Sequence, residues 1–533
     1  MAQKFNYLFV SDFHLSEGQN PANGLIQRNE DFFQDVPFAQ FIAHHVQLSR
    51  RETAVEFHNI PWKLVINGDI FDFLQVVTKP AEGKELLEAK GVRSYKELSA
   101  NEREYGLGTS ERETVWKLKR IANGHLVFFQ ALAWFLAHEG NELVLMKGNH
   151  DIELYWPEVQ TEFRRVLSKM YVSWRETAVR GNDLSPLPML PNMPDTLNLE
   201  TLAKAVSFPA NYLYEPGLFF VEHGCQYDPA NHFTNFNDPR LPQAPKFIEL
   251  PSGSFFVRYF FNKVEQIHPF ADNIKPIMKY LNWVLKHSPS AMVRVLIDLL
   301  PRFVLAWLKM KWKQLKSWWW HARNQEAASA PGASTTSAQF ENTLLEIQAN
   351  IRRKMKRASR LSSVGTVSSL LFKGLAWLLI LIGIRSFIEN DFIGMVIFVI
   401  LGGLSGFVGN ILIRMLDKLL ESPFLRWAAQ DVAKAINEDK SLANVPYYIY
   451  GHDHAAVTHA IKRENSSKQP QWYVNTGAWI PVFKEEERLL REDVQLTFLR
   501  LVPGRAAFPE APPELLQWSA EGNTPMPVRL FED

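Results

Sequence analysis

The sequence predicts an α/β layered domain that is interrupted by a helical insertion. Short apolar runs of strand length alternate with amphipathic stretches of helical length, which is the pattern of a sheet covered by helices. Polar motifs follow directly after most of the apolar runs, as they do where the loops beyond strand ends carry a site. The stretch from His223 to His452 is too long for one loop, so we expect the domain to be split there.

The predicted strands are short runs rich in aromatic and β-branched residues. They cover residues 5–10, 63–67, 142–146, 218–221, 446–450, 471–474 and 494–501, and we expect the last of them to close the sheet. Between the strands, residues 36–50 and 112–138 have the apolar periodicity of helices. Strands that alternate with helices in this way indicate an α/β fold.

Length and charge exclude several classes of protein. The chain has 533 residues, more than one hydrophobic core usually supports, so two or more units are expected. Its net charge of +1 provides no basic field, so nucleic acid is not an expected partner. The single cysteine, Cys225, excludes an intrachain disulfide framework, and we expect a small packed thiol. The N-terminus has no signal-peptide pattern, which makes the cytosol the default compartment.

Five short motifs carry oxygen and imidazole nitrogen donors. They are Asp12-Phe13-His14, Gly68-Asp69-Ile70-Phe71-Asp72, Gly148-Asn149-His150-Asp151, His223-Gly224 and Gly451-His452-Asp453-His454. Mixed carboxylate and imidazole donors suit Mn²⁺, Zn²⁺ or Fe better than Mg²⁺ or Ca²⁺. Because the donors follow strand ends, the sequence predicts that they gather into one metal site.

In these motifs and in their order, the chain resembles the calcineurin-like metallophosphoesterases. The resemblance covers residues 1–240 and 440–505 and implies a four-layer αββα sandwich that holds two divalent metal ions, most simply Mn²⁺, with Zn²⁺ or Fe as alternatives. It assigns Asp12, His14 and His454 to the first metal. It assigns Asn149, His223 and His452 to the second, with Asp69 as the bridge.

The same resemblance implies two catalytic residues and a reaction. His150 would face the substrate and protonate the leaving oxygen or stabilise the phosphoryl charge, and Asp72 would orient its imidazole. A hydroxide that bridges the metals would attack phosphorus. Asp151 is expected to cap a helix or support its loop. For His125 the sequence leaves two interpretations open, core packing and lining the mouth of the site.

The predicted domain boundaries follow from the insertion. Residues 1–240 and 441–533 form the two parts of the metallophosphoesterase domain, and residues 241–440 form the insertion. The insertion contains a Trp- and Lys-rich amphipathic stretch at 302–320, an Ala/Ser/Thr-rich linker at 322–340 and a hairpin at 366–413. The amphipathic stretch predicts either a helix in the headgroup region of an anionic membrane or a core helix with a solvated Lys face.

The hairpin is predicted to cross a membrane. Residues 392–413 carry no formal charge and are long enough to span the hydrocarbon core, whereas the first segment, bracketed by Lys373 and Arg385, could span or be re-entrant. The basic residues of 352–360 favour a cytoplasmic position for both ends of the hairpin, at the inner membrane if the organism is bacterial. The alternative is a buried hairpin of a large domain without a membrane.

These patterns together predict a metal-dependent phosphoester hydrolase at a membrane surface, acting on a lipid- or nucleotide-linked phosphoester or pyrophosphate. The motif order is similar to that of UDP-diacylglucosamine diphosphatases, but this chain has His150 where they have Arg, and they lack the hairpin. The alternatives are a tethered phosphatase or phosphodiesterase for soluble substrates and an inactive membrane scaffold. Glycines at 402–409 would allow the hairpins of two copies of the chain to pair, so the sequence leaves a homodimer as one interpretation.

Overall fold

The computed structural model describes residues 5–180, 186–264, 338–420, 424–461, 470–486, 489–505, 508 and 512–528. These residues belong to two compact units. The first contains Met1–Gln226, Ala230–Thr336 and Ile436–Asp533, and the second contains Tyr227–Pro229 and Ser337–Ala435. The amphipathic stretch predicted at 302–320 and nearly all of the linker predicted at 322–340 lie outside the described residues.

A mixed sheet of seven strands forms the centre of the first unit, with the order β16-β15-β14-β1-β2-β3-β4. Its strands are β1 (Asn6–Val10), β2 (Trp62–Asn67), β3 (Glu142–Met146), β4 (Val206–Ser207), β14 (Thr497–Leu501), β15 (Glu514–Ser519) and β16 (Thr524–Pro527). Strands β1 to β4 are parallel, and β14 joins β1 antiparallel. The prediction that the run ending at Leu501 closes the sheet is wrong, because β15 and β16 extend the sheet beyond it.

A second sheet of five strands has the order β10-β11-β9-β6-β5. Its strands are β5 (Tyr212–Glu215), β6 (Phe219–Glu222), β9 (Tyr447–Tyr450), β10 (Val457–Ala460) and β11 (Trp472–Asn475). Strand β9 pairs in parallel with both β6 and β11. The sheet therefore joins a strand from before the insertion to strands from after it.

Alternating side chains of the seven-stranded sheet fill two different cores. Tyr7 and Phe9 of β1 pack with Phe219 of β6, and their rings meet edge to face at centroid distances of 5.0 Å. Leu8 and Val10, which point to the opposite face, belong to the core shared with the helices. A strand with a period of two thus buries both of its faces, which explains why β1 is apolar throughout.

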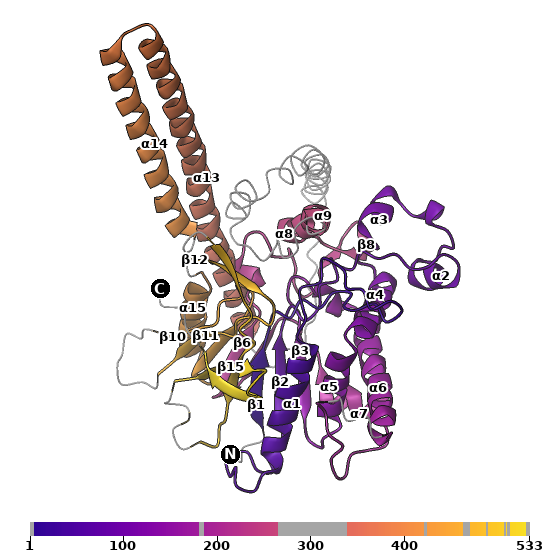
Figure 1. Cartoon of the computed structure of the whole chain (residues 1–533). Coiled ribbons are helices and arrows are strands. Elements are labelled where there is room, and N and C mark those ends of the chain that lie inside the picture. Colours follow the sequence, from indigo (N-terminus) through magenta and orange to yellow (C-terminus); the bar gives the residue numbers. More distant parts are fainter. Residues whose placement is uncertain are drawn as a thin grey trace. The chain divides into compact units, whose positions relative to one another are not determined.

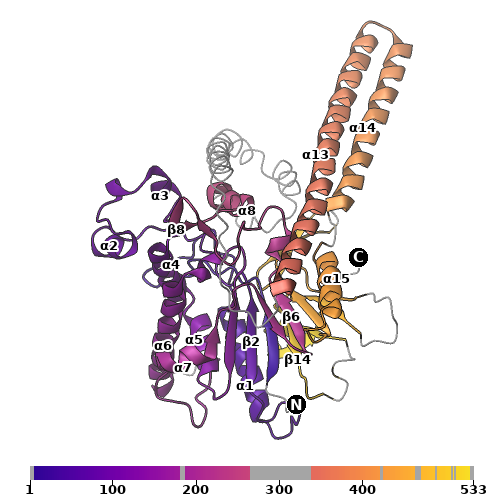
Figure 2. The same cartoon turned by 180° about the vertical axis from the view of Figure 1, so that it is seen from behind.

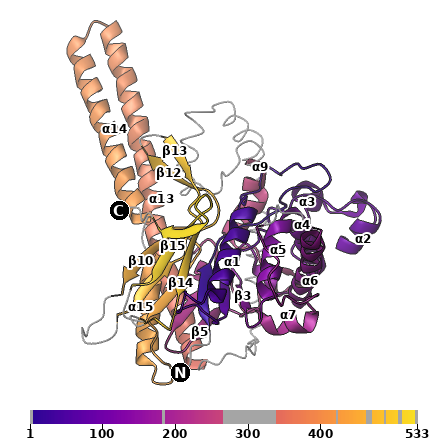
Figure 3. The ribbon, with the colours of Figure 1, turned by 60° about the horizontal axis from the view of Figure 1, so that its bottom comes forward.

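Helices cover the face of the large sheet opposite the second sheet (Figure 1). They are α1 (Asp35–Arg50), α4 (Glu111–Gly124), α5 (Leu126–Leu136) and α6 (Pro157–Val179), and Figure 3 shows α1, α5 and α6 beside the strands β1 to β3. The helix predicted at 36–50 is confirmed, and the stretch predicted at 112–138 consists of two helices that meet at His125. The structure therefore confirms an α/β layered arrangement.

The remaining elements of the described residues are mostly short. They are α2 (Lys84–Lys90), η1 (Tyr95–Glu97), α3 (Ala100–Tyr105), η2 (Ile152–Tyr155), α7 (Leu199–Ala205), η3 (Cys225–Tyr227), β7 (Arg240–Leu241), β8 (Ala244–Ile248), α8 (Ser252–Phe256), η4 (Val257–Phe261), α9 (Asn262–Val264), α15 (Phe424–Glu438), β12 (Val482–Glu486) and β13 (Leu489–Asp493). Of the predicted insertion, residues 241–264 and 436–440 are described in the first unit, and the first of these ranges includes β8 and the segment from α8 to α9.

Two long helices dominate the second unit. Helices α13 (Ala338–Ile388) and α14 (Phe392–Leu420) lie side by side and antiparallel, joined by a short turn (Figure 2). This is the helical hairpin that the sequence predicts. Within the described residues, no helix is both long enough and apolar enough to cross a membrane. The transmembrane character of the hairpin therefore has no support from this criterion and stays a prediction.

Candidate metal centre

Side chains from the ends of five strands meet at one place in the first unit. Asp12 follows β1, Asp69 follows β2 and Asn149 follows β3, all at the carboxyl ends of neighbouring parallel strands. His223 and His452 follow β6 and β9, which are parallel neighbours in the second sheet. The parallel pairing explains why residues far apart in the sequence gather at one edge of the layers.

One group consists of Asp12, His14 and His454, whose donor atoms all lie within 4.8 Å of one another. The Nε2 atoms of His14 and His454 are 3.3 Å apart, and Nε2 of His454 is 3.4 Å from Oδ1 of Asp12. Two imidazole nitrogens and a carboxylate oxygen that converge in this way form a site that could hold a metal ion.

A second group consists of Asp69, His223 and His452, all buried. Nε2 of His223 lies 3.1 Å from Oδ2 of Asp69. Nδ1 of His223 lies 2.7 Å from the carbonyl oxygen of Asn67, and because a carbonyl only accepts, Nδ1 is the protonated nitrogen. This bond fixes the ring and directs Nε2 into the site, as backbone carbonyls do for histidine ligands of metals.

The surroundings of the Asn149 side-chain oxygen indicate whether these residues are suited to bind a cation. Its side chain is 3 % exposed, and among the described residues Oδ1 has no hydrogen-bond partner. A buried carbonyl oxygen without a partner is unfavourable by about 1–3 kcal/mol unless something else binds it. Together with the facing imidazoles of His14 and His454, this oxygen makes the donor set suitable for divalent cations.

The backbone at these residues is strained in a way that points to a function. Positive φ angles, rare for residues other than glycine, occur at Asp12 (55°), His14 (50°), Asp69 (52°), His452 (76°) and His454 (60°). Such conformations are costly and gather at sites where side chains must point in a required direction. All five residues belong to the predicted ligand set.

His150 lies beside both groups and forms a third group of close donor atoms with His14 and Asp69. Its Nδ1 is 2.5 Å from Oδ2 of Asp72, and its backbone N–H donates to Oδ1 of Asp69 at 2.8 Å. The ring also meets that of His14 edge to face at a centroid distance of 4.5 Å. The His150 side chain is 15 % exposed, whereas Asp72 is fully buried, so the imidazole is the member of this pair that solvent can reach.

Burial and ionic partners shift the pKa values of the carboxylates and imidazoles of the site in opposite directions. Burial opposes ionisation of Asp12, but the imidazoles of His454 and His223 outweigh it and lower the pKa of Asp12. Asp69 is also buried, and His223 and His150 hold its pKa well below the usual value. Burial alone would lower the pKa of His223, but Asp69 raises it to about 10. The carboxylates are therefore ionised at neutral pH.

Residues outside the ligand set support the site. Oδ1 of Asp151 accepts from the Gly148 N–H at 2.6 Å and Oδ2 accepts from the Ile70 N–H at 2.8 Å, so this carboxylate links two ligand loops. It does not cap the short helix η2 that follows, which leaves loop support as its role. Oγ of Ser11 bonds Oγ1 of Thr476 at 2.7 Å and joins the first and last parts of the domain. Cys225 is buried, as expected for a packed thiol.

His125 neither packs as a neutral core residue nor belongs to the donor groups. Its Nδ1 lies 3.1 Å from Asp35 and its Nε2 lies 3.3 Å from Glu30, and the ring is 2 % exposed. Burial disfavours the charged ring, but the two carboxylates raise its pKa to about 10. A buried imidazolium bracketed by two carboxylates is a structural ion-pair network.

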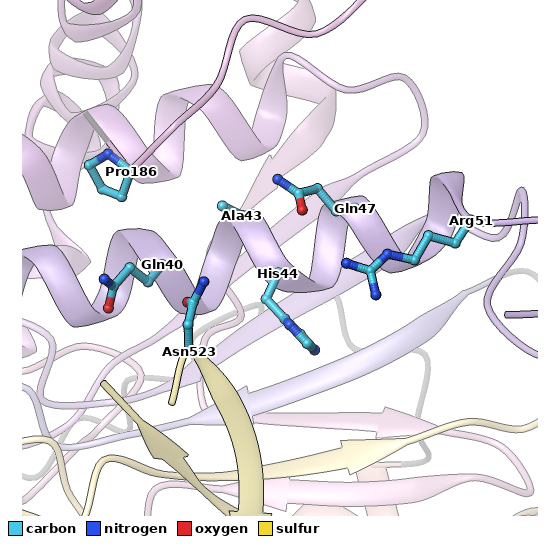
Figure 4. A pocket seen from close by; sticks show the side chains of 7 residues that line it. All are labelled: Gln40, Ala43, His44, Gln47, Arg51, Pro186 and Asn523. Carbon is cyan, nitrogen blue, oxygen red and sulfur yellow. The ribbon is translucent and has the colours of Figure 1, made fainter. Parts of the chain in front are cut away.

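A separate cavity of about 240 Å³ lies along helix α1 (Figure 4). Its walls are formed by Gln40, Ala43, His44, Gln47, Arg51, Pro186 and Asn523. None of the predicted metal ligands lines it. This cavity is therefore distinct from the candidate metal centre.

Comparisons with known proteins do not identify the chain. No protein-family model matches it, and no curated protein is significantly similar to it.

Proposed function

We propose that this protein is a dinuclear-metal-dependent phosphoesterase of the calcineurin-like superfamily, with the αββα sandwich of that family. One observation carries the proposal. The predicted ligands, drawn from five strand ends on both sides of the insertion, converge in the first unit as two adjoining Asp/His groups with the unpartnered oxygen of Asn149.

The two groups define which residues would hold the cations. Asp12, His14 and His454 would hold one, and Asn149, His223 and His452 the other, with Asp69 between them. When bound, two divalent cations supply positive charge to a phosphoryl oxygen and activate the attacking water near neutral pH. Mn²⁺, Zn²⁺ and Fe all suit this mixture of carboxylate and imidazole donors, and Mn²⁺ is the ion proposed here.

His150 and Asp72 supply the proton chemistry. Oδ2 of Asp72 accepts a hydrogen bond from Nδ1 of His150, which fixes the ring. Nε2 is then the atom that donates a proton to the leaving oxygen of a phosphoester, and 15 % exposure of the ring leaves it accessible. Asp72 acts through His150 because it is fully buried.

The second part of the proposal places the protein at a membrane. Large apolar side chains on the outward faces of α13 and α14 are exposed, including Trp377 at 68 %, Ile393 at 72 % and Phe407 at 62 %. Exposed apolar surfaces of this extent mark interaction sites. Within 374–408 the charged residues are Arg385, Glu389 and Asp391, next to the turn between the helices.

The inward face of the hairpin is built from small residues. A Cβ at Gly402 would lie 2.9 Å from Ile380, and Oγ of Ser405 donates to the Phe372 carbonyl at 2.7 Å. Small residues between two helices with large apolar residues outside are typical of helices packed in lipid. The exposed basic residues at 353–357 suit anionic headgroups. These features support a bilayer as the surroundings of the hairpin.

The test of activity uses full-length protein in mild detergent with Mn²⁺. It compares hydrolysis of UDP-diacylglucosamine with that of bis-p-nitrophenyl phosphate, with His150→Ala as the control. Cleavage of the lipid-linked diphosphate that requires His150 supports a lipid-linked substrate. Cleavage of the soluble diester alone supports a tethered enzyme for soluble substrates, and no His150-dependent cleavage of either contradicts the proposal.

The test of location is flotation with anionic phospholipid vesicles. Ile393→Asp, Ile400→Asp and Phe407→Asp in one variant should abolish flotation because they place charges on the exposed face of α14. Val55→Asp with Val179→Asp is the control, since these exposed residues lie in the first unit. Failure of the unmodified protein to float, or concentration-dependent dimerisation through the same face, contradicts the bilayer proposal.

A further inference from the structure

The turn that begins at Asp72 is held by its own carboxylate. We call residues 72–78 the Asp72 turn. Oδ1 of Asp72 accepts from the backbone N–H groups of Leu74 at 2.9 Å and Gln75 at 3.0 Å, while Oδ2 faces His150. The direction of the carboxylate towards His150 therefore depends on the position of the Leu74 and Gln75 peptides.

Buried side chains from distant parts of the chain hold these peptides. Nζ of Lys117, from α4, donates to the Phe73 carbonyl at 2.8 Å. The amide of Asn29 donates to the Gln75 carbonyl. Oε1 of Glu17 accepts from the backbone N–H groups of residues 77 and 78 at 3.0 and 2.7 Å. Each donor or acceptor is at most 2 % exposed, so each bond is made away from water.

The Leu74 carbonyl is held from the insertion. Nδ2 of Asn262, in α9, donates to it at 2.7 Å, and the Asn262 side chain is 3 % exposed. Arg258 lies four residues before Asn262 in the sequence. Its Nη2 donates to the carbonyls of Gly106 and Leu107 at 3.0 and 2.9 Å. Gly106 itself packs on the end of the Asp72 turn, because a Cβ there would lie 3.0 Å from the Val76 oxygen. The insertion thus bonds the turn directly through Asn262 and supports it indirectly through Arg258 and Gly106.

We infer that Asn262 is a positioning residue for the Asp72–His150 pair, so that the insertion takes part in turnover as well as in anchoring. This inference rests on the proposed function. The physical reason is that removal of the Asn262 donor leaves the Leu74 carbonyl buried without a partner. The turn then relaxes, and a small displacement of a positioned proton donor lowers the rate of the chemical step more than it lowers substrate binding.

The experiment compares Asn262→Asp with Lys263→Ala in the full-length protein. Asn262→Asp keeps the shape of the side chain but, when ionised, cannot donate to Leu74. Lys263 is the matched control, because its Nζ donates at 3.0 Å to a carbonyl outside the turn, that of Glu104. Two quantities are measured: amide hydrogen exchange at residues 74 and 75, and kcat and KM for the substrate that the activity test identifies.

We expect Asn262→Asp to speed amide exchange at residues 74 and 75 and to lower kcat, each by on the order of ten-fold, with KM and bound metal unchanged. Lys263→Ala should change neither. Asn29→Ala, which removes the hydrogen bond from Asn29 to the neighbouring Gln75 carbonyl, should reproduce the effects of Asn262→Asp. If Asn262→Asp does not fold, Asn262→Ala, which adds no charge, replaces it.

Two failures are distinguishable. If the unmodified protein hydrolyses no phosphoester, the proposed function fails, while hydrogen exchange still decides whether Asn262 holds the turn. If the unmodified protein is active and Asn262→Asp matches Lys263→Ala in both exchange and kcat, the inference is overturned. A rise in KM with unchanged kcat also overturns it, since that result assigns Asn262 to substrate binding.

Discussion

Nδ1 of His150 lies 2.5 Å from Oδ2 of Asp72, although 78 residues separate them in the sequence. The two residues follow neighbouring parallel strands, β3 and β2, whose register brings Met146 opposite Asn67. The pairing of the strands therefore brings His150 and Asp72 together. A carboxylate behind an imidazole fixes the orientation of the ring.

The first prediction concerns this pair. His150→Gln should lower kcat by about 10²- to 10⁴-fold, the usual contribution of a general acid, and Asp72→Asn should have a smaller effect of the same kind. A proton donor matters most for a poor leaving group, so loss should be larger for an alkyl phosphoester than for a p-nitrophenyl ester. Equal losses on both esters would assign His150 to charge stabilisation instead.

The second prediction concerns the metal ligands. Asp69→Asn should reduce the metal content, measured by plasma mass spectrometry, from about two ions per chain towards none, because Asp69 adjoins both donor groups. Chelation of the unmodified protein should abolish activity, and Mn²⁺ should restore it. Asp195→Asn, an exposed carboxylate outside the groups, is the control. An unchanged metal content in Asp69→Asn would contradict the proposal that Asp69 lies between two metal ions.

The location of the site could be predicted from the sequence because strand and motif are adjacent in the chain. Asp12 and His14, for example, follow the last residue of β1 by only a few positions. The strand therefore fixes where these two donors lie. The support of the Asp72 turn could not be predicted, since Asn29 and Asn262, which donate to it, lie far apart in the sequence. An asparagine in a loop carries no local signal of which carbonyl it will meet.

The break between α4 and α5 also depends on contacts that the local sequence does not reveal. The apolar periodicity continues through 112–138, and it is the ion pairs of His125 with Glu30 and Asp35 that fix the junction. The strands β15 and β16 escaped prediction because Pro513 immediately precedes β15, and Pro525 and Pro527 lie within β16. Periodicity therefore predicted the buried elements, and tertiary contacts decided where they end.

The third prediction is a pH dependence of stability. The pKa of His125 rises from 6.5 to about 10 on folding. Folding therefore favours the protonated ring, and this contribution is complete below pH 6.5 and is lost as the pH rises through about 10. The difference in melting temperature between the unmodified protein and His125→Gln should be largest near pH 6 and shrink towards pH 10.

His138 provides the control for this prediction. It is also buried, but burial lowers its pKa to about 4, so it is neutral in both the folded and the unfolded chain between pH 7.5 and 10. His138→Gln should therefore change the melting temperature by the same amount across that range. A parallel trend in both variants would mean that the ion pairs of His125 do not cause the pH dependence.

The fourth prediction is that Gly124→Ala destabilises the protein although it lies in a helix. Alanine normally favours a helix over glycine by about 1 kcal/mol. At Gly124, however, a Cβ would lie 1.9 Å from the carbonyl oxygen of Glu17, which belongs to the loop after His14. Overpacking against backbone is unfavourable by about 1–3 kcal/mol, so the free energy of unfolding should fall.

Urea unfolding of Gly124→Ala and Gly374→Ala separates the two effects. Gly374 is also in a helix, but nothing lies within 4 Å of a Cβ placed there, so Gly374→Ala should leave stability unchanged or raise it. Gly124→Ala should also lower kcat, because the displaced Glu17 holds the Asp72 turn through residues 77 and 78. A stable Gly124→Ala variant with full activity would show that the loop after His14 can move without disturbing the site.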